Sequence, residues 1–142
     1  MNFSIKKLLT ISAIVALTAC SARNDAYFLP ISEVVRSAEA KQHLSPKFQM
    51  AFGKTLSGQV VAHGLKTSKS ANAFGKDDMA ACRRAMLSAL IQLQHKAAEL
   101  GVTKISNIQS NYKNNPFSSE NKYECHVGHF PANVALKADF VK

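Results

Sequence analysis

The chain has 142 residues, with 18 basic and 9 acidic side chains and a formal net charge of +9. This length accommodates one ordinary domain and excludes two comfortable cores. The positive charge favours anionic partners, but the basic residues are scattered through every segment. We therefore expect a solvated basic surface in preference to a dedicated anion site.

The first twenty residues resemble the leader of a bacterial lipoprotein precursor. Two lysines precede an apolar run over residues 8–17, and Leu17-Thr18-Ala19-Cys20 resembles the lipobox at which such precursors are cut and acylated. The apolar run is shorter than the roughly 20 residues that a transmembrane helix needs. We therefore expect residues 1–19 to be a lipoprotein signal peptide that is removed, with Cys20 lipidated. The alternative is ordinary signal cleavage near Ala19, with Cys20 as an incidental thiol.

A lipidated Cys20 predicts an address and a partner. By resemblance to lipoprotein sorting, Ser21 in place of Asp implies the outer membrane of a Gram-negative cell. Acyl chains contribute about 0.8 kcal/mol per buried methylene, so the lipid bilayer is the first expected partner. Residues 20–25 would be a short tether and residues 26–142 a single domain. Loss of two lysines with the leader lowers the net charge to +7, and the anionic partners available there are envelope components and acidic proteins.

The first half of the expected domain has weak patterns. A plausible Ser32 cap predicts a short helix, and Gly64 is a possible bulge within a strand. In chain order we expect an extended segment at 26–30, a helix at 32–43, an alternating segment at 48–52 and a strand at 59–68.

The strongest pattern predicts a long amphipathic helix over residues 77–100. Asp77 and Asp78 suit a helix N-terminus, and Gly101 suits a left-handed cap. At 100° per residue, one apolar arc gathers most of the large side chains. Its members are Met79, Cys82, Met86, Ala89, Leu90, Leu93, Ala97 and Leu100.

Three further strands are expected at residues 105–112, 122–127 and 133–141, the last with one wet face. These segments and the long helix predict an α+β fold of two layers. One long amphipathic helix would pack on an antiparallel sheet, with a short N-terminal helix beside them.

The two cysteines of the expected domain lie where they could pair. Cys82 falls in the apolar arc of the helix, and Cys125 lies in a strand that should pack beneath it. An exported protein favours a disulfide between them, which would close a loop of roughly 40 residues and contribute about 3–4 kcal/mol. The alternative is two buried free thiols.

Metal and catalytic chemistry have weak support. His126 beside Cys125, with His129 nearby, could suggest thiolate and imidazole ligands. A disulfide would remove Cys125, however, and period 2 places His126 on the other strand face. Gly53-Lys54-Thr55 lacks the earlier glycine of a phosphate-binding loop. We expect no catalytic residue, no cofactor and no specific binding of nucleic acid, with His126 and His129 as weak metal candidates.

Several short motifs stand in the second half of the chain. They are Asn72-Ala73-Phe74-Gly75-Lys76, Ala81-Cys82-Arg83, Leu87-Ser88-Ala89-Leu90, Phe117-Ser118-Ser119, Tyr123-Glu124-Cys125-His126 and Val134-Ala135-Leu136-Lys137. Together they resemble a family of small exported bacterial proteins whose members are often labelled as the excinuclease ATPase subunit. The resemblance covers residues 72–142 and, more loosely, 26–71. A true excinuclease ATPase would need nucleotide-binding loops, zinc modules and several times this length.

A helix that ends in glycine before Asn-containing strands is, more distantly, similar to the YbjQ-type domain. It also resembles the outer-membrane Rcs stress-sensor lipoprotein, whose signalling domain is disulfide-braced. That resemblance implies a helix-on-sheet domain that binds or senses at the envelope, although function does not follow from fold.

Two functions of different class remain. The first is a non-catalytic, outer-membrane lipoprotein whose domain makes protein contacts or senses envelope stress. The basic surface and the loop at residues 113–120, which begins at Lys113, are its candidate contact region. The second is a periplasmic module that binds a small ligand or a metal through His126, His129 and neighbouring polar groups.

Overall fold

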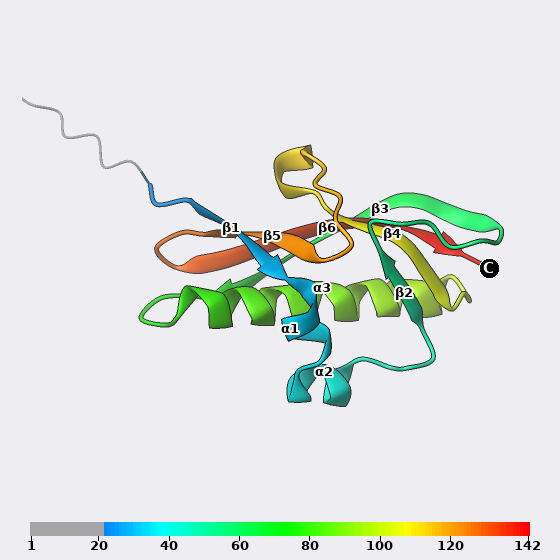
Figure 1. Ribbon diagram of the computed structural model, residues 1–142, viewed down its shortest axis with the longest axis horizontal. Helices are drawn as coiled ribbons and strands as arrows, with labels where there is room; N and C mark the ends of the chain where they lie inside the picture. Colours follow the sequence, from blue (N-terminus) through cyan, green and yellow to red (C-terminus); the bar gives the residue numbers. More distant parts are fainter. Residues whose placement is uncertain (1–21) are drawn as a thin grey trace, which may run out of the picture.

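The computed structural model describes residues 22–142 (Figure 1). The expected signal peptide and Cys20 lie outside the described residues. The elements in chain order are β1 (Asp25–Pro30), α1 (Ile31–Val35), α2 (Ala38–His43), β2 (Gln49–Phe52), β3 (Val60–Asn72), α3 (Asp78–Glu99), β4 (Lys104–Ser110), the 3₁₀ turn η1 (Tyr112–Asn114), β5 (Lys122–Val127) and β6 (Pro131–Val141). The expected α+β class is confirmed.

The strands form a curled, six-stranded sheet centred on β6. β3 runs antiparallel along one edge of β6. Along the other edge, β5 pairs with the N-terminal part of β6 and β4 pairs with its C-terminal part. β1 lies antiparallel outside β5, and β2 lies parallel outside β4. The expectation of a purely antiparallel sheet is therefore wrong. β3 and α3 separate β2 from β4 in the chain, and a crossover of that length allows two strands to run in the same direction.

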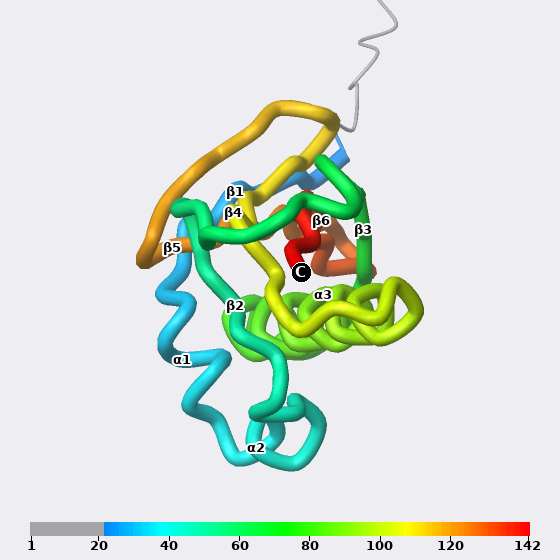
Figure 2. Tube along the Cα trace, turned by 90° about the vertical axis from the view of Figure 1, so that its right-hand side faces the viewer, coloured from blue at the N-terminus to red at the C-terminus, as the bar shows by residue number. Residues whose placement is uncertain are grey.

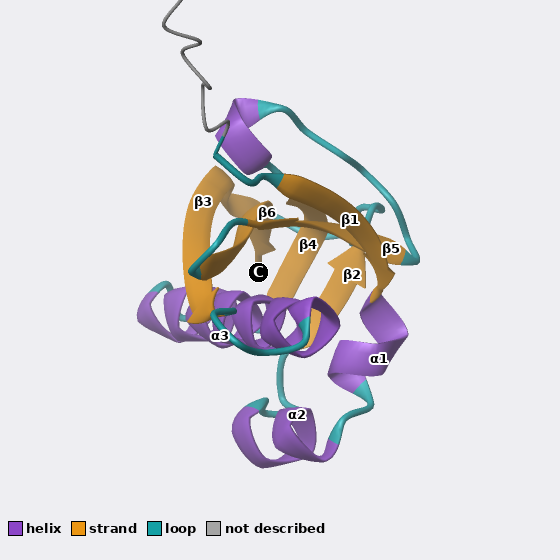
Figure 3. Cartoon of the chain, turned by 90° about the vertical axis from the view of Figure 1, so that its left-hand side faces the viewer, coloured by secondary structure: helices purple, strands orange, loops and turns teal. Residues whose placement is uncertain are grey.

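The long helix α3 lies across the concave side of the sheet (Figures 2 and 3). Asp77 caps it as expected, because its carboxylate oxygens accept from the backbone N–H groups of Met79 and Ala80 at 3.4 and 3.3 Å. Gly101 follows with a φ of +69°, a conformation that glycine adopts without strain. The expected helix and both of its boundaries are confirmed.

The apolar arc of α3 is confirmed in its middle and wrong at its end. The middle of the arc is buried against β3 and β6, but Leu100 is 41% exposed. The buried face of α3 extends beyond the arc to Gln94, a polar residue that is only 4% exposed. The Gln94 amide accepts from Ser45 N at 2.8 Å and donates to Ser45 O at 3.2 Å, so this side chain holds the segment after α2 to the helix.

The expected single helix over residues 32–43 is wrong, because two short helices replace it. Ser37 separates them: its hydroxyl accepts from Ala40 N at 3.1 Å and donates to Val34 O at 2.7 Å. The N-cap of α2 is therefore Ser37, whereas α1 begins after Pro30 without a side-chain cap. A serine that bonds to the local backbone competes with a continuous helix.

The expected bulge at Gly64 is confirmed, and it accompanies a shift in the register between β3 and β6. The pairing of β3 with β6 shifts on both sides of Ala62. Within this irregularity, Asp139 Oδ1 accepts from Gly64 N and lies 2.8 Å from His63 Nδ1. The expectation that the last strand exposes one face to solvent is wrong at Asp139, which is only 9% exposed.

Candidate functional site

A disulfide joins the helix to the sheet beneath it. Cys82 lies in the second turn of α3 and Cys125 lies on β5, with their sulfurs 2.03 Å and their Cα atoms 5.9 Å apart. Both residues are completely buried. The expected pairing is confirmed, and Cys125 is thereby removed from any metal site.

A polar cluster occupies the opposite face of β5. His126 Nε2 lies 2.7 Å from Glu124 Oε1, and His126 Nδ1 lies 3.2 Å from Asn24 Oδ1. Tyr112 covers the imidazole, with 3.5 Å between the ring centroids and 10° between the planes. His126 is only 9% exposed, whereas Asn24 at the edge of the cluster is exposed.

The hydrogen bonds of this cluster constrain the protons of His126. A carboxylate only accepts, so Nε2 must carry the hydrogen that it donates to Glu124. When the imidazole is charged, Nδ1 donates to Asn24 Oδ1. When it is neutral, Nδ1 accepts from the NH₂ group of Asn24 after a flip of the side-chain amide. The cluster therefore satisfies His126 in either state, which is typical of a structural role rather than of a ligand that awaits a metal.

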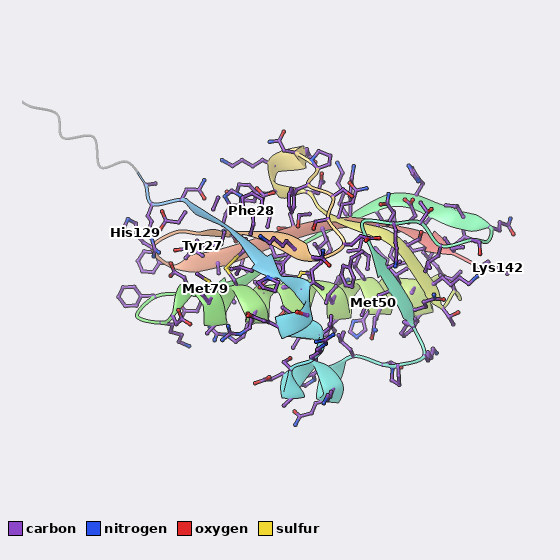
Figure 4. The ribbon with its side chains drawn as sticks, viewed as in Figure 1. Tyr27, Phe28, Met50, Met79, His129 and Lys142 are labelled. Carbon is purple, nitrogen blue, oxygen red and sulfur yellow. A yellow bond between two sulfur atoms is a disulfide. The ribbon has the colours of Figure 1, made fainter. Side chains whose placement is uncertain are left out.

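His129, the second weak metal candidate, lies in the exposed hairpin between β5 and β6. Figure 4 places it at one end of the long axis of the molecule. Across residues 22–142, no group of three or more His, Cys, Asp or Glu side chains could hold a metal ion. The structure thus brings His126 together with Glu124 and Tyr112, and it does not join the two histidines in a metal site.

The loop at residues 113–120 is held against the outer face of the sheet. Phe117 pairs with Ser110 through backbone hydrogen bonds of 3.1 and 2.9 Å, and its ring packs edge-on against Phe28 at 4.8 Å. Lys113 and Asn114 have positive φ values of 50° and 61° and are exposed at the tip. The expected contact region is therefore a fixed loop with an exposed cationic tip.

The segment that enters the domain is fastened by an ionic cluster that the sequence patterns did not indicate. Arg23 pairs with Asp25 at 2.7 Å and with Asp78, and the Tyr27 hydroxyl donates to Asp78 at 2.8 Å. Hydrogen bonds to Asp25 and Asp78 raise the pKa of Arg23, and the hydrogen bond to Asp78 raises the pKa of Tyr27. Since β1 also begins at Asp25, residues 23–25 of the expected tether are fastened to the domain.

A shallow hollow of about 400 Å³ lies between η1 and the β5–β6 hairpin. Arg23, Tyr112, Lys113, His129 and Phe130 are among the residues that line it, and the buried His126 is not. The hollow offers the exposed ammonium group of Lys113 and no carboxylate among its lining residues, which is chemistry that can attract a small anion.

The described residues thus form a disulfide-braced α+β domain with a fastened N-terminal segment. No protein-family model matches the chain. The curated proteins and the solved structures likewise yield no match. No helix within residues 22–142 is long and apolar enough to cross a membrane.

Proposed function

We propose that the protein is a non-catalytic lipoprotein of the outer membrane, anchored through acylated Cys20 with its domain in the periplasm. The proposal rests first on the sequence Leu17-Thr18-Ala19-Cys20 after a basic and apolar leader. The signal peptide would be residues 1–19. The same motifs that resemble the small exported family support this address.

The observation that carries the proposal is the Cys82–Cys125 disulfide. The chain has three cysteines, and this bond uses two of them. Cys20 is left as the cysteine available for lipid. Disulfides persist in oxidising compartments such as the periplasm, so a buried bond of this kind agrees with export.

The proposed activity of the domain is contact with an envelope protein or with an anionic envelope component. The fixed loop at residues 113–120 presents Lys113 and Asn114, and Lys66 donates to Asn114 at 2.8 Å across from β3. Exposed loops on a rigid scaffold are common sites of recognition. The resemblance to the Rcs stress-sensor lipoprotein supports a sensing role for such contacts.

A second candidate function is a periplasmic module that binds a small ligand. The hollow beside Tyr112, Lys113 and His129 favours it, since the ammonium group of Lys113 could attract a small anion there. Elemental analysis and native mass spectrometry of protein purified from the periplasm separate the two candidates. A bound metal or small molecule at equal stoichiometry would favour the second.

Changing Cys20 tests the anchor. Wild-type protein should carry the mass of its acyl chains and fractionate with outer membranes, whereas the Cys20→Ser variant should lack that mass and be lost from the outer-membrane fraction. Ser21→Asp is the matched control, because it should keep the lipid mass but change the membrane in which the protein is found. Two results together would contradict the proposal: the Cys20→Ser variant still fractionates with outer membranes, and the wild-type protein shows no lipid-sized increase in mass.

A further inference from the structure

Two phenylalanines form an exposed aromatic pair at one end of the domain. Phe74 is 63% exposed and Phe130 is 66% exposed, yet their rings stack with centroids 5.3 Å apart and 23° between the planes. Phe74 belongs to the turn between β3 and α3, and Phe130 belongs to the β5–β6 hairpin. Isolated exposed apolar side chains are ordinary, but a contiguous pair from two separate loops indicates a contact surface.

The backbone holds this pair in place. Ala73 N donates to Phe130 O at 2.6 Å, which joins the two loops directly. Lys76 N donates to Ala73 O at 3.1 Å, and Gly75 has the positive φ of +65° that a type II turn needs at its third position. Asn72 Oδ1 accepts from Phe74 N at 3.0 Å. We call Phe74, Phe130 and the two turns that carry them the aromatic tip.

The chain enters the domain beside the aromatic tip. Arg23 Nη1 lies 3.4 Å from Gly128 O, at the base of the hairpin that carries Phe130. The backbones are so close here that a Cβ on Gly128 would lie 3.2 Å from Arg23 O. Cys20 precedes Arg23 by three residues, so at most about 10 Å of extended chain separates them.

The aromatic tip lies at one end of the longest axis of the molecule. Figure 1 shows the β5–β6 hairpin, the turn before α3 and the entering chain together at this end. In Figure 4, His129 lies there and Lys142 lies at the opposite end. A bilayer that held Cys20 would therefore meet this end of the domain first.

Charge within the aromatic tip and the entering segment is close to balanced, and the exposed Lys113 of the neighbouring loop adds one positive charge beside Phe130. Arg23 is paired with Asp25 and Asp78, while the exposed Lys76 and Asp77 follow each other with opposite sign. Attraction of this end to a bilayer without net charge would therefore come from the aromatic rings. Phenylalanine is among the residues that interfacial segments place at the boundary of headgroups and acyl chains.

We propose that the aromatic tip inserts into the interfacial region of the bilayer that anchors Cys20, so that the domain stands with its long axis away from the membrane. This inference rests on the proposed lipoprotein function. It gives the domain a fixed orientation, in which the lipid and two phenylalanines hold one end. The loop at residues 113–120 and the far end of α3 then stay accessible to a partner.

Tryptophan fluorescence tests the orientation, because the chain contains no tryptophan. The full-length Phe130→Trp protein, processed and lipidated in cells, is reconstituted into phosphatidylcholine vesicles with brominated acyl chains. Its emission should shift to shorter wavelength and be quenched several-fold more than that of two control variants. Phe28→Trp is the aromatic control on β1, and Leu100→Trp reports from beyond the other end of α3.

Two further measurements separate an aromatic attraction from an electrostatic one, and the mass of the protein shows which of the two proposals fails. Adding Phe74→Ser to Phe130→Trp should reduce the quenching, whereas about 0.5 M salt should leave it unchanged because phosphatidylcholine vesicles carry no net charge for the protein to be attracted to. Equal quenching at all three tryptophan positions in protein of lipidated mass would overturn the orientation and leave the anchor standing. Quenching that salt abolishes would overturn the aromatic basis. Protein that lacks the lipid mass would overturn both proposals.

Discussion

The ring of Tyr112 lies flat on the imidazole of His126, with 3.5 Å between the centroids and 10° between the planes. Tyr112 opens the loop that crosses the outer face of β5, so this stack fixes the start of that loop. It also explains why a histidine that could suggest a metal ligand is only 9% exposed. Glu124 closes the other side of the imidazole at 2.7 Å.

Replacing Tyr112 should loosen the loop without unfolding the domain. The Tyr112→Ala variant loses the aromatic stack, so amides at residues 113–120 should exchange faster while those of α3 keep their protection. Hydrogen exchange followed by mass spectrometry measures both. Tyr112→Phe keeps the stacked ring and should behave like the wild type. Equal exchange in the Ala variant and the wild type would show that the stack does not hold the loop.

Removing the disulfide should cost much of the stability of the domain. Cys82 and Cys125 are 43 positions apart, and a closed loop of that length corresponds to about 4 kcal/mol in the chain-entropy model. The Cys82→Ser and Cys125→Ser variants should therefore be protease-sensitive, and the double variant should be no worse than either. Urea unfolding gives the free energies. Reduction of the wild type supplies a control without mutation, and unchanged stability after complete reduction would contradict the prediction.

Replacing Tyr123 by phenylalanine should stabilise the protein. The Tyr123 side chain is 1% exposed, and its hydroxyl has no hydrogen-bond partner within the described part of the chain. A buried hydroxyl that makes no hydrogen bond costs free energy, so Tyr123→Phe should raise the free energy of unfolding by about 1 kcal/mol. Urea titration at neutral pH measures the change. Destabilisation by this variant would mean that the hydroxyl has a partner.

Stability should fall in alkali because two tyrosines resist ionisation in the fold. The hydrogen bond to Asp78 raises the pKa of Tyr27, and burial raises the pKa of Tyr123. A raised pKa in the folded state contributes stability that is complete below the ordinary value of about 10 and is lost as the pH rises above it. Urea titrations between about pH 8 and 11 should show this decline. The double Tyr27→Phe, Tyr123→Phe variant should decline less, and an equal decline would contradict the assignment.

Two glycines with the same backbone conformation should differ in their tolerance of alanine. Gly53 and Gly64 have φ values of +64° and +63°, but a Cβ on Gly53 would lie 2.7 Å from the Ser119 carbonyl carbon, whereas Gly64 has open space. Gly64→Ala should cost about 1–2 kcal/mol from the left-handed backbone alone. Gly53→Ala should cost clearly more, because the loop backbone must move. Thermal unfolding compares them, and equal costs would refute the steric argument.

The sequence predicted the elements whose signals are local. Asp77 and Gly101 bound a long apolar arc, so α3 could be identified with its ends before any contact was known. The disulfide followed from the same arc, because helix and strand periodicity place Cys82 and Cys125 in one layer. Ser37 was missed as the break between α1 and α2, although a serine three residues before Ala40 is a signal of a cap.

The burial of Gln94 and the direction of the edge strand β2 depend on contacts between residues that are far apart in the chain. Gln94 is buried because Ser45, 49 residues earlier, pairs with its amide, and no local pattern carries that information. The parallel pairing of β2 with β4 depends in the same way on a crossover through β3 and α3.

By itself, the sequence determined the fold class, the long helix, the Cys82–Cys125 pair and the motif that predicts a lipid on Cys20. These follow from periodicity, capping and spacing, which act over a few residues. The tertiary structure alone decided that Arg23 is fastened beside Gly128 and that Phe74 stacks on Phe130. Such pairs join segments that are far apart in the chain, and only the closure of the sheet around α3 brings them together.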